Sequence, residues 1–377
     1  MTRRFVRGIG ALALAISLTA GGGTSAAAGG PAWTQDGYGA GNTGYNPAES
    51  TINANSVGKL KLRWTVAPVP ATEGCADSKT PVVADGRMFI VDGDGVGAYG
   101  VRNGKLLWRN ATVMATRVGR TLTVVGHLVI TTGWSCFGMS NPSGHMSALD
   151  VQTGKLRWHV MQGDNIVSVV ADRGTIVANA ECSVCGSSSV TGYRASDGKQ
   201  TWTNQDNVAT GPVSAGGRLL LTAMDGGSSA VAVATGKALW KSSMRWTSLA
   251  ANPSGDTFYA TNPAGALAAV DARTGEVAWS VPKAAGPLAA DGRRVFVAKS
   301  GITAFDAKTG RKRWSHLGNA GPRPVRAGGL LYAAGGALSP VTGATVLANG
   351  YGGNHVVVVG GRLYATSGEG VVRAYAP

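Results

Sequence analysis

One phrase returns along the whole chain and ends, in most copies, on Gly, three further residues and Trp. Its best copies occupy residues 149–158, 270–279 and 305–314. The six copies that keep the spacing are Gly104 with Trp108, Gly154 with Trp158, Gly198 with Trp202, Gly236 with Trp240, Gly275 with Trp279, and Gly310 with Trp314. A seventh copy runs from Gly343 to Leu347 and has lost the Trp. Successive Trp residues are 35 to 50 positions apart, which is typical of repeats that each form one supersecondary unit.

A second element precedes the phrase in each repeat. Residues 81–91, 287–297 and 356–365 are apolar runs interrupted by Asp-Gly or Gly-Gly, a pattern that predicts two strands around a tight hairpin turn. The Thr-Gly turn adds a second pair of strands, the last of which ends in Trp. Each repeat is therefore predicted to be a four-stranded antiparallel sheet, and no long amphipathic helix competes with this interpretation.

Four-stranded sheets repeated around an axis form a β-propeller. Seven units carry the turn phrase, and residues 355–377 supply only three strands of an eighth. Residues 59–64 end in Trp64 but follow no blade of their own, so they are expected to supply the missing strand. Such pairing would close the ring and leave no open edge between the first and last blades. The fold class is therefore predicted to be all-β, an eight-bladed propeller closed by its N-terminal strand.

The phrase Asp-x-x-Thr-Gly-x-x-x-Trp, headed by Asp150, Asp271 and Asp306, resembles the tryptophan-docking repeat of the quinoprotein family, the PQQ-like eight-bladed propellers. The resemblance covers nearly the whole chain after its first residues. In that family the motif specifies the fold better than the function. The family includes PQQ-dependent alcohol dehydrogenases, the outer-membrane assembly scaffold of the BamB type, and exported propellers that have neither role.

The resemblance implies a test of the enzyme hypothesis. The dehydrogenases of the family hold PQQ against a disulfide between adjacent cysteines, bind Ca²⁺ and use an Asp as base. This chain has no Cys-Cys dipeptide and is short beside those enzymes. We therefore expect no catalytic, cofactor-binding or metal-binding residues and no cofactor. A PQQ-dependent dehydrogenase with Ca²⁺ stays as the alternative.

The first residues predict export. Three Arg residues precede an apolar stretch from Ile9 to Ala20, and a small-residue cleavage pattern follows at 26–28. This arrangement favours a Sec signal peptide over a twin-arginine signal. The predicted organisation is a signal peptide over 1–28, a lead-in over 29–58 and the propeller over 59–377. The protein is expected to be secreted or to reside in the cell envelope or periplasm, with no membrane-spanning segment.

Loss of 1–28 removes three Arg and no acidic residue, so the net charge falls from +15 to +12. The Lys and Arg residues are scattered singly along the chain, which does not indicate a specific nucleic-acid site. A basic balance is compatible with general solvation or with an acidic ligand. We expect a monomer whose partner is an envelope or extracellular protein, or an acidic ligand.

Four cysteines are present, and an even number in an exported protein predicts disulfides. The propeller topology places Cys75, Cys136 and the Cys182/Cys185 pair in loops on the same face. We therefore predict a Cys75–Cys136 bridge between adjacent blades and a Cys182–Cys185 bridge that closes a small loop. A redox or zinc role for Cys182-x-x-Cys185 is the alternative, but no second CxxC or pair of His accompanies it.

Two further motifs are weak. Gly39-x-Gly41-x-x-Gly44 matches a dinucleotide fingerprint only formally, because no strand precedes it and no helix follows, and we interpret it as a flexible lead-in. Asp92-Gly-Asp94-Gly resembles the start of a calcium loop, but Asn103 stands where the final Glu is required. We interpret it as a hairpin turn.

The rim of the central channel is the best candidate for a binding site. Alignment of the blades on the first hairpin Gly puts Thr80, Arg120, Gly211, Gly286, Arg323 and His355 at equivalent starts of the innermost strands. Loops on the same face add three more residues. The predicted ligand-binding set is Thr80, Arg120, Trp134, Arg245, Trp246, Arg323 and His355. The seven docking tryptophans, which are Trp64, Trp108, Trp158, Trp202, Trp240, Trp279 and Trp314, are predicted to be structural.

Overall, the sequence favours an exported, non-catalytic binding or scaffolding propeller that binds a protein or an acidic ligand at its loop-bearing face. The rival interpretation is a quinone-dependent oxidoreductase.

Overall fold

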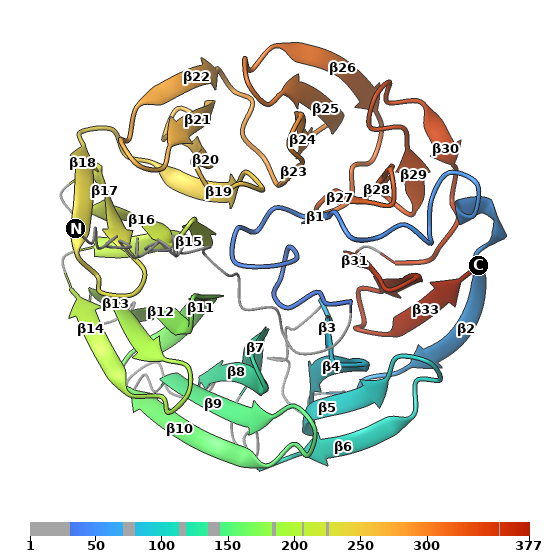
Figure 1. The fold of residues 1–377 in the computed structure, drawn as a ribbon, viewed down its shortest axis with the longest axis horizontal. Helices are drawn as coiled ribbons and strands as arrows, with labels where there is room; N and C mark the ends of the chain where they lie inside the picture. The colour runs from blue at the N-terminus through green and yellow to red at the C-terminus, as the bar shows by residue number, and fades with distance from the viewer. Residues whose placement is uncertain are drawn as a thin grey trace, which may run out of the picture.

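The computed structural model describes residues 31–70, 80–112, 118–134, 144–182, 186–205, 207–223, 226–353 and 355–377. Within these residues the strands form eight sheets arranged side by side around one axis, which confirms the predicted eight-bladed propeller (Figure 1). Each blade has four antiparallel strands, and the first strand of each blade lies nearest the axis. Blade seven gains a fifth strand, β1 (Tyr45–Asn46), which pairs in parallel with β27 through Tyr45 and Arg326.

The strands of the first four blades are β3 (Val82–Ala84), β4 (Arg87–Asp92), β5 (Gly95–Gly100) and β6 (Leu106–Asn110); β7 (Val118–Val125), β8 (Leu128–Trp134), β9 (Gly144–Asp150) and β10 (Leu156–Gln162); β11 (Asn165–Asp172), β12 (Thr175–Cys182), β13 (Ser187–Arg194) and β14 (Gln200–Asn204); and β15 (Asn207–Ala215), β16 (Arg218–Ala223), β17 (Ser228–Ala232) and β18 (Ala238–Ser242). The strands of the last four are β19 (Thr247–Ala251), β20 (Thr257–Thr261), β21 (Leu267–Asp271) and β22 (Val277–Val281); β23 (Leu288–Ala290), β24 (Arg294–Ala298), β25 (Gly301–Asp306) and β26 (Lys312–Leu317); β27 (Val325–Ala327), β28 (Leu330–Ala333), β29 (Gly336–Leu338) and β30 (Thr345–Leu347); and β31 (His355–Val359), β32 (Arg362–Thr366), β33 (Val372–Ala376) and β2 (Lys61–Val66).

Blade eight is shared by the two ends of the chain. Strand β2 pairs antiparallel with β33, and Trp64 lies opposite Ala374. The Arg63 guanidinium also donates a hydrogen bond to the carbonyl of Pro377. This confirms the expected closure of the ring by the strand that carries the orphan Trp64.

The antiparallel order of each blade gives the ring two different faces. Strands one and three of a blade run in the same direction, so the hairpin turn after strand one and the Thr-Gly turn after strand three emerge together. We call this side the turn face. The opposite side, which carries the connections from strand two to three and from strand four to the next blade, is the loop face. Asp92 and Gly95 pair across one such loop-face connection, as expected of a hairpin.

Each of the seven tryptophans contacts the following blade in the same way. The indole Nε1–H of Trp279, for example, donates to the Ala307 carbonyl at 3.0 Å, and a Cβ added to Gly310 would lie 2.7 Å from the indole ring. The other indole donors and carbonyl acceptors are Trp64 to Val101, Trp108 to Val151, Trp158 to Ala195, Trp202 to Val233, Trp240 to Ala272, and Trp314 to Pro340. Every indole therefore packs on the Gly of the next blade's turn, where a side chain would collide with the ring.

This geometry explains the missing tryptophan at Leu347. A Trp at that position in blade seven would need a turn between the third and fourth strands of blade eight. Those strands are β33 and β2, which are the two ends of the chain, so no such turn connects them. Leu347 thus occupies the one junction that has no glycine turn to receive an indole.

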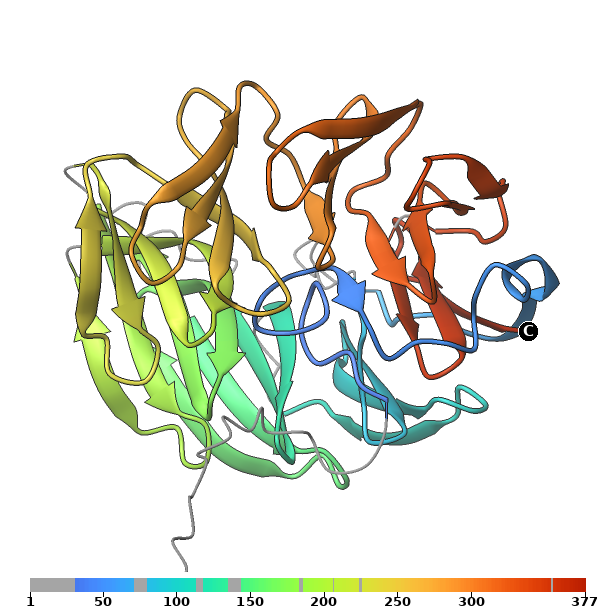
Figure 2. The ribbon, with the colours of Figure 1, turned by 45° about the horizontal axis from the view of Figure 1, so that its top comes forward.

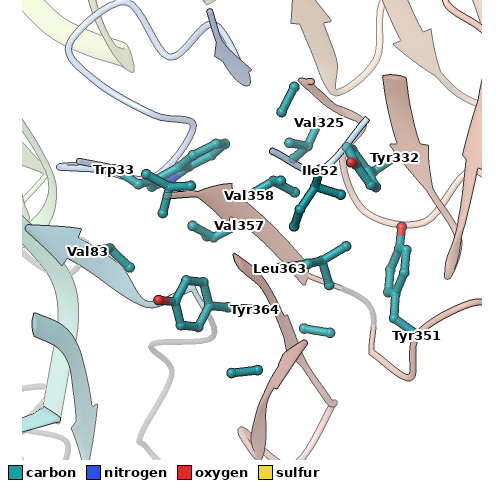
Figure 3. Close-up of a cluster of buried hydrophobic side chains, with 14 of the residues drawn as sticks. Trp33, Ile52, Val83, Val325, Tyr332, Tyr351, Val357, Val358, Leu363 and Tyr364 are labelled. Atoms are coloured by element: carbon teal, nitrogen blue, oxygen red, sulfur yellow. The ribbon is translucent and has the colours of Figure 1, made fainter. Parts of the chain in front are cut away.

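The largest buried cluster joins the two ends of the chain to the last blades. Trp33 and Ile52 of the lead-in are 1% and 0% exposed, and they pack with Val358, Leu363 and the neighbouring side chains of blades seven, eight and one (Figure 3). The short 3₁₀ helix η1 (Val57–Lys59) follows and leads into β2. Burial of these side chains removes apolar surface from water and so fixes the lead-in against the ring.

Several predictions fall outside the described residues or are not tested by them. The signal peptide, Cys75, Cys136 and Cys185 lie outside the described residues. Cys182, at the end of β12, is disulfide-bonded, and its pairing stays a prediction, as do the domain boundaries. In the described part of the chain, no helix has the length and apolar character required to span a bilayer.

Candidate functional site

The lead-in occupies the centre of the ring and contacts every blade. In the tilted view it lies among the inner strands, with β1 beside blade seven (Figure 2). The partners, in chain order, are Trp33 with Val83, Thr34 with Val124, Gln35 with Ala171, Ala40 with Ser214, Gly41 with Ala251, Thr43 with Ala290, Gly44 with Arg326, and Asn46 with Val358. The second residue of each pair belongs to the innermost strand of a blade, in order from blade one to blade eight. The prediction of a flexible Gly39–Gly44 segment is therefore wrong.

Most of these contacts are backbone hydrogen bonds. Lead-in carbonyls accept from the amides of Ser214 at 2.8 Å and Ala251 at 2.7 Å, and the Gln35 side-chain amide imitates a strand by bonding both the N–H and the C=O of Ala171. Unpaired amides buried along the channel would be costly, and the lead-in satisfies them. The contacts lie near the ends of the inner strands, so the lead-in closes the channel toward the turn face.

Arg323, which precedes β27 of blade seven, also holds the lead-in in place. Its guanidinium donates to the carbonyls of Asn42 at 2.9 Å and Leu288 at 3.3 Å, and it lies 3.7 Å from a carboxylate oxygen of Asp36. Gly37 lies so close that an added Cβ would be 2.6 Å from the guanidinium, and its φ of +71° suits glycine. Burial lowers the pKa of Arg323 and Asp36 opposes this, but an Arg side chain stays a cation at neutral pH.

A cavity of about 490 Å³ lies on the loop-face side of the lead-in. Its wall comes from blades four, five and six, with Asn42 and Arg323 at the lead-in. The lining residues are Asn42, Gly211, Pro212, Thr247, Ser248, Leu249, Thr261, Ala285, Gly286, Pro287, Leu288 and Arg323. Asn42 is held in place because its side-chain amide donates to the Leu249 carbonyl at 2.9 Å. The channel is therefore closed toward one face and hollow toward the other.

The lead-in contacts also correct the alignment of the rim. The position three residues before each contacted residue is Thr80, Thr121, Ser168, Gly211, Ser248, Pro287, Arg323 and His355 in blades one to eight. Blade two thus contributes Thr121 rather than Arg120, and blade six contributes Pro287 rather than Gly286. The shift arises in the hairpin turns. Gly126 is the first of two residues between β7 and β8, whereas Gly86 is the second of two between β3 and β4, and three residues separate β23 from β24. A spacing counted from the hairpin Gly cannot foresee these differences.

The remaining predicted residues lie in different environments. Thr80 and His355 are half-buried at inner-strand starts, and Arg245 is exposed in the loop before β19. Trp246 is only 3% exposed and packs with Val213 and Phe258, so its ring is not accessible to a ligand. The side chains of Arg120 and Trp134 lie outside the described residues. Only Arg323 of the predicted set lines the cavity.

The chemistry of the cavity lining can be compared with what a calcium-bound quinone requires. The described lining residues offer hydroxyl, amide and backbone groups together with one cation, and none of them is a carboxylate that could ligate Ca²⁺ or act as a base. Among the described residues, no three His, Cys, Asp or Glu side chains gather as a metal site. The lining residues therefore do not fit a calcium-bound quinone.

A pair of histidines escaped the sequence analysis. His145 of β9 and His159 of β10 stack with their ring centroids 5.3 Å apart, and Ser147 lies 2.9 Å from Nδ1 of His159. The two residues are 14 positions apart in sequence, and only the pairing of β9 with β10 brings them together. Ser147 is buried, so the group lacks an accessible nucleophile.

The comparisons with known proteins agree with the repeat pattern. A model of the family described as outer membrane protein assembly factor BamB matches residues 24–227, 144–282 and 225–376. The BamB protein of Shewanella oneidensis is 26% identical over 231 residues, which are 53% of this chain and 56% of that protein. The chain thus matches about half the length of that curated relative.

Two kinds of solved structure share the fold. BamB of Moraxella catarrhalis is 20% identical and superposes with a TM-score of 0.58, covering 84% of this chain and 100% of that one. A quinohemoprotein alcohol dehydrogenase of Comamonas testosteroni is 15% identical, with a TM-score of 0.66 and coverage of 91% and 80%. Likeness at these identities establishes the fold alone.

Proposed function

Because the chain belongs to the family of the outer membrane protein assembly factor BamB, we propose that it is an exported, non-catalytic module that binds an envelope or extracellular protein at its loop face. The observation that carries this proposal is the asymmetry of the channel. The lead-in fills its turn-face side with contacts to all eight blades, whereas the loop-face side keeps a hollow of about 490 Å³. A concave site that opens among irregular loops is a common arrangement for a binding surface.

The rival function is that of a PQQ-dependent oxidoreductase, and it is considered because the fold resembles that of a quinohemoprotein alcohol dehydrogenase. Its test is a titration of the purified protein with PQQ and Ca²⁺, followed by quinone absorbance and by dye reduction with alcohols as substrates. We expect neither a saturable change in absorbance nor turnover, because the cavity offers no carboxylate. Stoichiometric quinone binding with turnover would reject the non-catalytic proposal.

A small acidic ligand in the cavity is a second candidate, because Arg323 is the one charged residue among the lining residues. Small dicarboxylates and acidic sugars should raise the melting temperature, and the rise should shrink with salt. The variant Arg323→Gln should lose the rise. Arg326→Gln is a matched control, because Arg326 pairs with Asp291 at 3.2 Å and does not line the cavity. If both variants lost the rise in melting temperature equally, or if no acid raised the melting temperature, an acidic ligand in this cavity would be rejected.

A further inference from the structure

The turn face carries a ring of cations at one repeated position. The docking positions are those of the seven docking tryptophans and of Leu347 in blade seven. The residue three positions before each of them is basic in six of the eight blades, namely Lys61, Lys105, Lys155, Lys199, Lys237 and Arg311. The exceptions are Glu276 in blade five and Ala344 in blade seven. All eight side chains are exposed. The scattered basic residues of the sequence are therefore partly ordered by the fold into one ring.

The backbone makes these positions equivalent. In the seven blades that have a Thr-Gly-type turn, the carbonyl of this residue accepts a hydrogen bond from the amide five positions earlier. The pairs, acceptor first, are Lys105 with Gly100, Lys155 with Asp150, Lys199 with Arg194, Lys237 with Ala232, Glu276 with Asp271, Arg311 with Asp306, and Ala344 with Ser339. In blade eight, Lys61 instead starts β2 opposite Ala376. Each ring residue therefore lies at the start of an outermost strand or directly before it, at the turn face.

Three acidic residues of the Thr-Gly-type turns are matched with other cations. Asp150 pairs with Arg157 at 2.6 Å, Asp306 with Arg313 at 2.5 Å, and Asp197 lies 3.5 Å from Arg194. Asp150 also accepts the turn amides of Gln152 and Thr153. In the described part of the molecule, no ion pair includes a ring cation. Among the described residues of these turns, Asp271 and Glu276 of blade five are the acidic residues without a cation partner, so the ring cations of the other blades are not compensated by the turns.

Exposed leucines follow the ring cations along the outermost strands. Leu62, Leu106 and Leu156 come directly after Lys61, Lys105 and Lys155, and they are 53%, 50% and 47% exposed. These three belong to the adjacent blades eight, one and two. Blade four repeats the pattern with one residue between Lys237 and Leu239, which is 47% exposed.

We infer that the turn face binds the surface of an anionic lipid bilayer. The outermost strands that the ring residues start or directly precede lie on opposite sides of the disc, as β2, β10, β18 and β26 show (Figure 1). A compact acidic ligand cannot reach all of them together, whereas a flat anionic surface can meet every cation at once. Lys beside an exposed Leu also suits the interface, where an aliphatic side chain enters the headgroup boundary and the ammonium stays in water.

The test is co-sedimentation of the purified protein with vesicles of phosphatidylglycerol and phosphatidylcholine, compared with vesicles of phosphatidylcholine alone. We expect binding to the anionic vesicles only, weakening strongly as salt rises from about 0.05 M to about 0.5 M. The triple variant Lys61→Glu, Lys105→Glu, Lys155→Glu should lower the partition coefficient at least about tenfold. Circular dichroism and the melting temperature report whether the variant is folded, and the salt series of the unaltered protein tests the inference without any variant.

The matched control reverses three exposed cations of the loop-face side, Lys241→Glu, Arg245→Glu and Lys283→Glu, for the same change in net charge. It should keep at least about half of the vesicle binding. An equal loss in both triple variants would show that net charge alone acts and would overturn the inference. Binding to soluble polyglutamate as tight as to anionic vesicles would overturn it in favour of an acidic macromolecule. Absence of any preference for anionic vesicles would also overturn it.

Orientation can be measured separately with a photoactivatable lipid in the anionic vesicles. Adducts should map to turn-face peptides such as 150–157 and 306–313. Adducts confined to loop-face peptides such as 241–248 would contradict the inference, whatever the affinity.

Discussion

The two faces of the ring differ in how regular their contacts are. The turn face repeats one set of interactions: seven blades place an indole on the glycine of the next turn, seven turns have a carbonyl bond across them, and all eight inner strands have a lead-in contact near their end. On the loop face the connections differ in length and the contacts differ from blade to blade. The cavity there is lined by residues of blades four to six together with Asn42 and Arg323.

The difference suggests that stability and binding are divided between the faces. Repeated contacts that each join neighbouring blades are what hold a closed ring together. Irregular loops on a rigid scaffold are free to vary and to carry recognition. Substitutions in the buried turn-face contacts should therefore change mainly stability, and substitutions on the loop face should change mainly the binding of a protein partner.

The largest expected effect comes from removing the lead-in. Deletion of residues 31–46 should lower the free energy of unfolding by more than about 5 kcal/mol, because each lost hydrogen bond contributes about 1 kcal/mol and Trp33 leaves the core. Urea denaturation followed by circular dichroism measures the change. The sequence alone led us to expect that trimming residues 29–45 would cost far less stability than deleting residues 59–64, which removes most of β2; the contacts with eight blades argue against that expectation. A truncated protein as stable as the parent would show that the lead-in is dispensable.

Trp279→Ala should be the most damaging single change at the turn face. Loss of a buried large aromatic side chain destabilises a protein by about 3–5 kcal/mol, and the Ala307 carbonyl also loses its donor. Leu347→Ala is the comparison, because this side chain lies at the junction without a glycine turn and is smaller and half-buried. It should cost about 1–2 kcal/mol. Equal losses of melting temperature would mean that the indole contact adds nothing beyond ordinary burial.

Gly310→Ala should separate close packing from backbone strain. Gly310 has a φ of +69°, and an added Cβ would lie 2.7 Å from the Trp279 ring, so we expect a loss of about 2–3 kcal/mol. Gly265→Ala is the matched control, because Gly265 has a φ of +74° with open space around its Cα. Its cost should be about 1 kcal/mol, from strain alone. Chemical denaturation of both variants gives the difference, and no difference would argue against close docking of the indole on the turn.

The smallest effect concerns acid stability. Hydrogen bonds from Arg157 lower the pKa of Asp150 from its ordinary value of 3.8 to about 2, and Arg313 does the same for Asp306. A depressed carboxyl pKa contributes stability above the unfolded value, and this contribution is lost as pH falls from about 4 to about 2. Arg157→Gln should make unfolding less steeply pH-dependent in this window, whereas Lys155→Gln, whose side chain does not bond Asp150, should not. Identical acid-unfolding curves for the two variants would contradict this origin of the dependence.

The sequence predicted the repeated part of the molecule well. The Gly-x-x-x-Trp spacing identified the blades, and the orphan Trp64 identified the strand that closes blade eight, because both patterns arise from contacts that recur in every unit. It did not explain Leu347, because the docking of each indole on the glycine turn of the next blade is seen only in the structure.

The central part was much harder to predict. The lead-in binds mainly through its backbone carbonyls, so the side chains of Gly39 to Gly44 carry no signal of its path. Gly126 is the first residue of its hairpin turn, whereas Gly86 is the second residue of the turn in blade one, and this difference moves the rim position from Arg120 to Thr121. Trp246 looked like a loop residue because it precedes a strand, but it turns into the core between blades four and five.

The division between the two faces is tested most directly by placing a photo-crosslinking amino acid at one exposed arginine of each face, Arg245 on the loop face and Arg273 on the turn face, in the cell that produces the protein. The account predicts a discrete protein adduct from position 245 that is absent from position 273. A protein adduct that forms from position 273 and not from position 245 would contradict it, because the partner would then bind the face that the lead-in and the turns close.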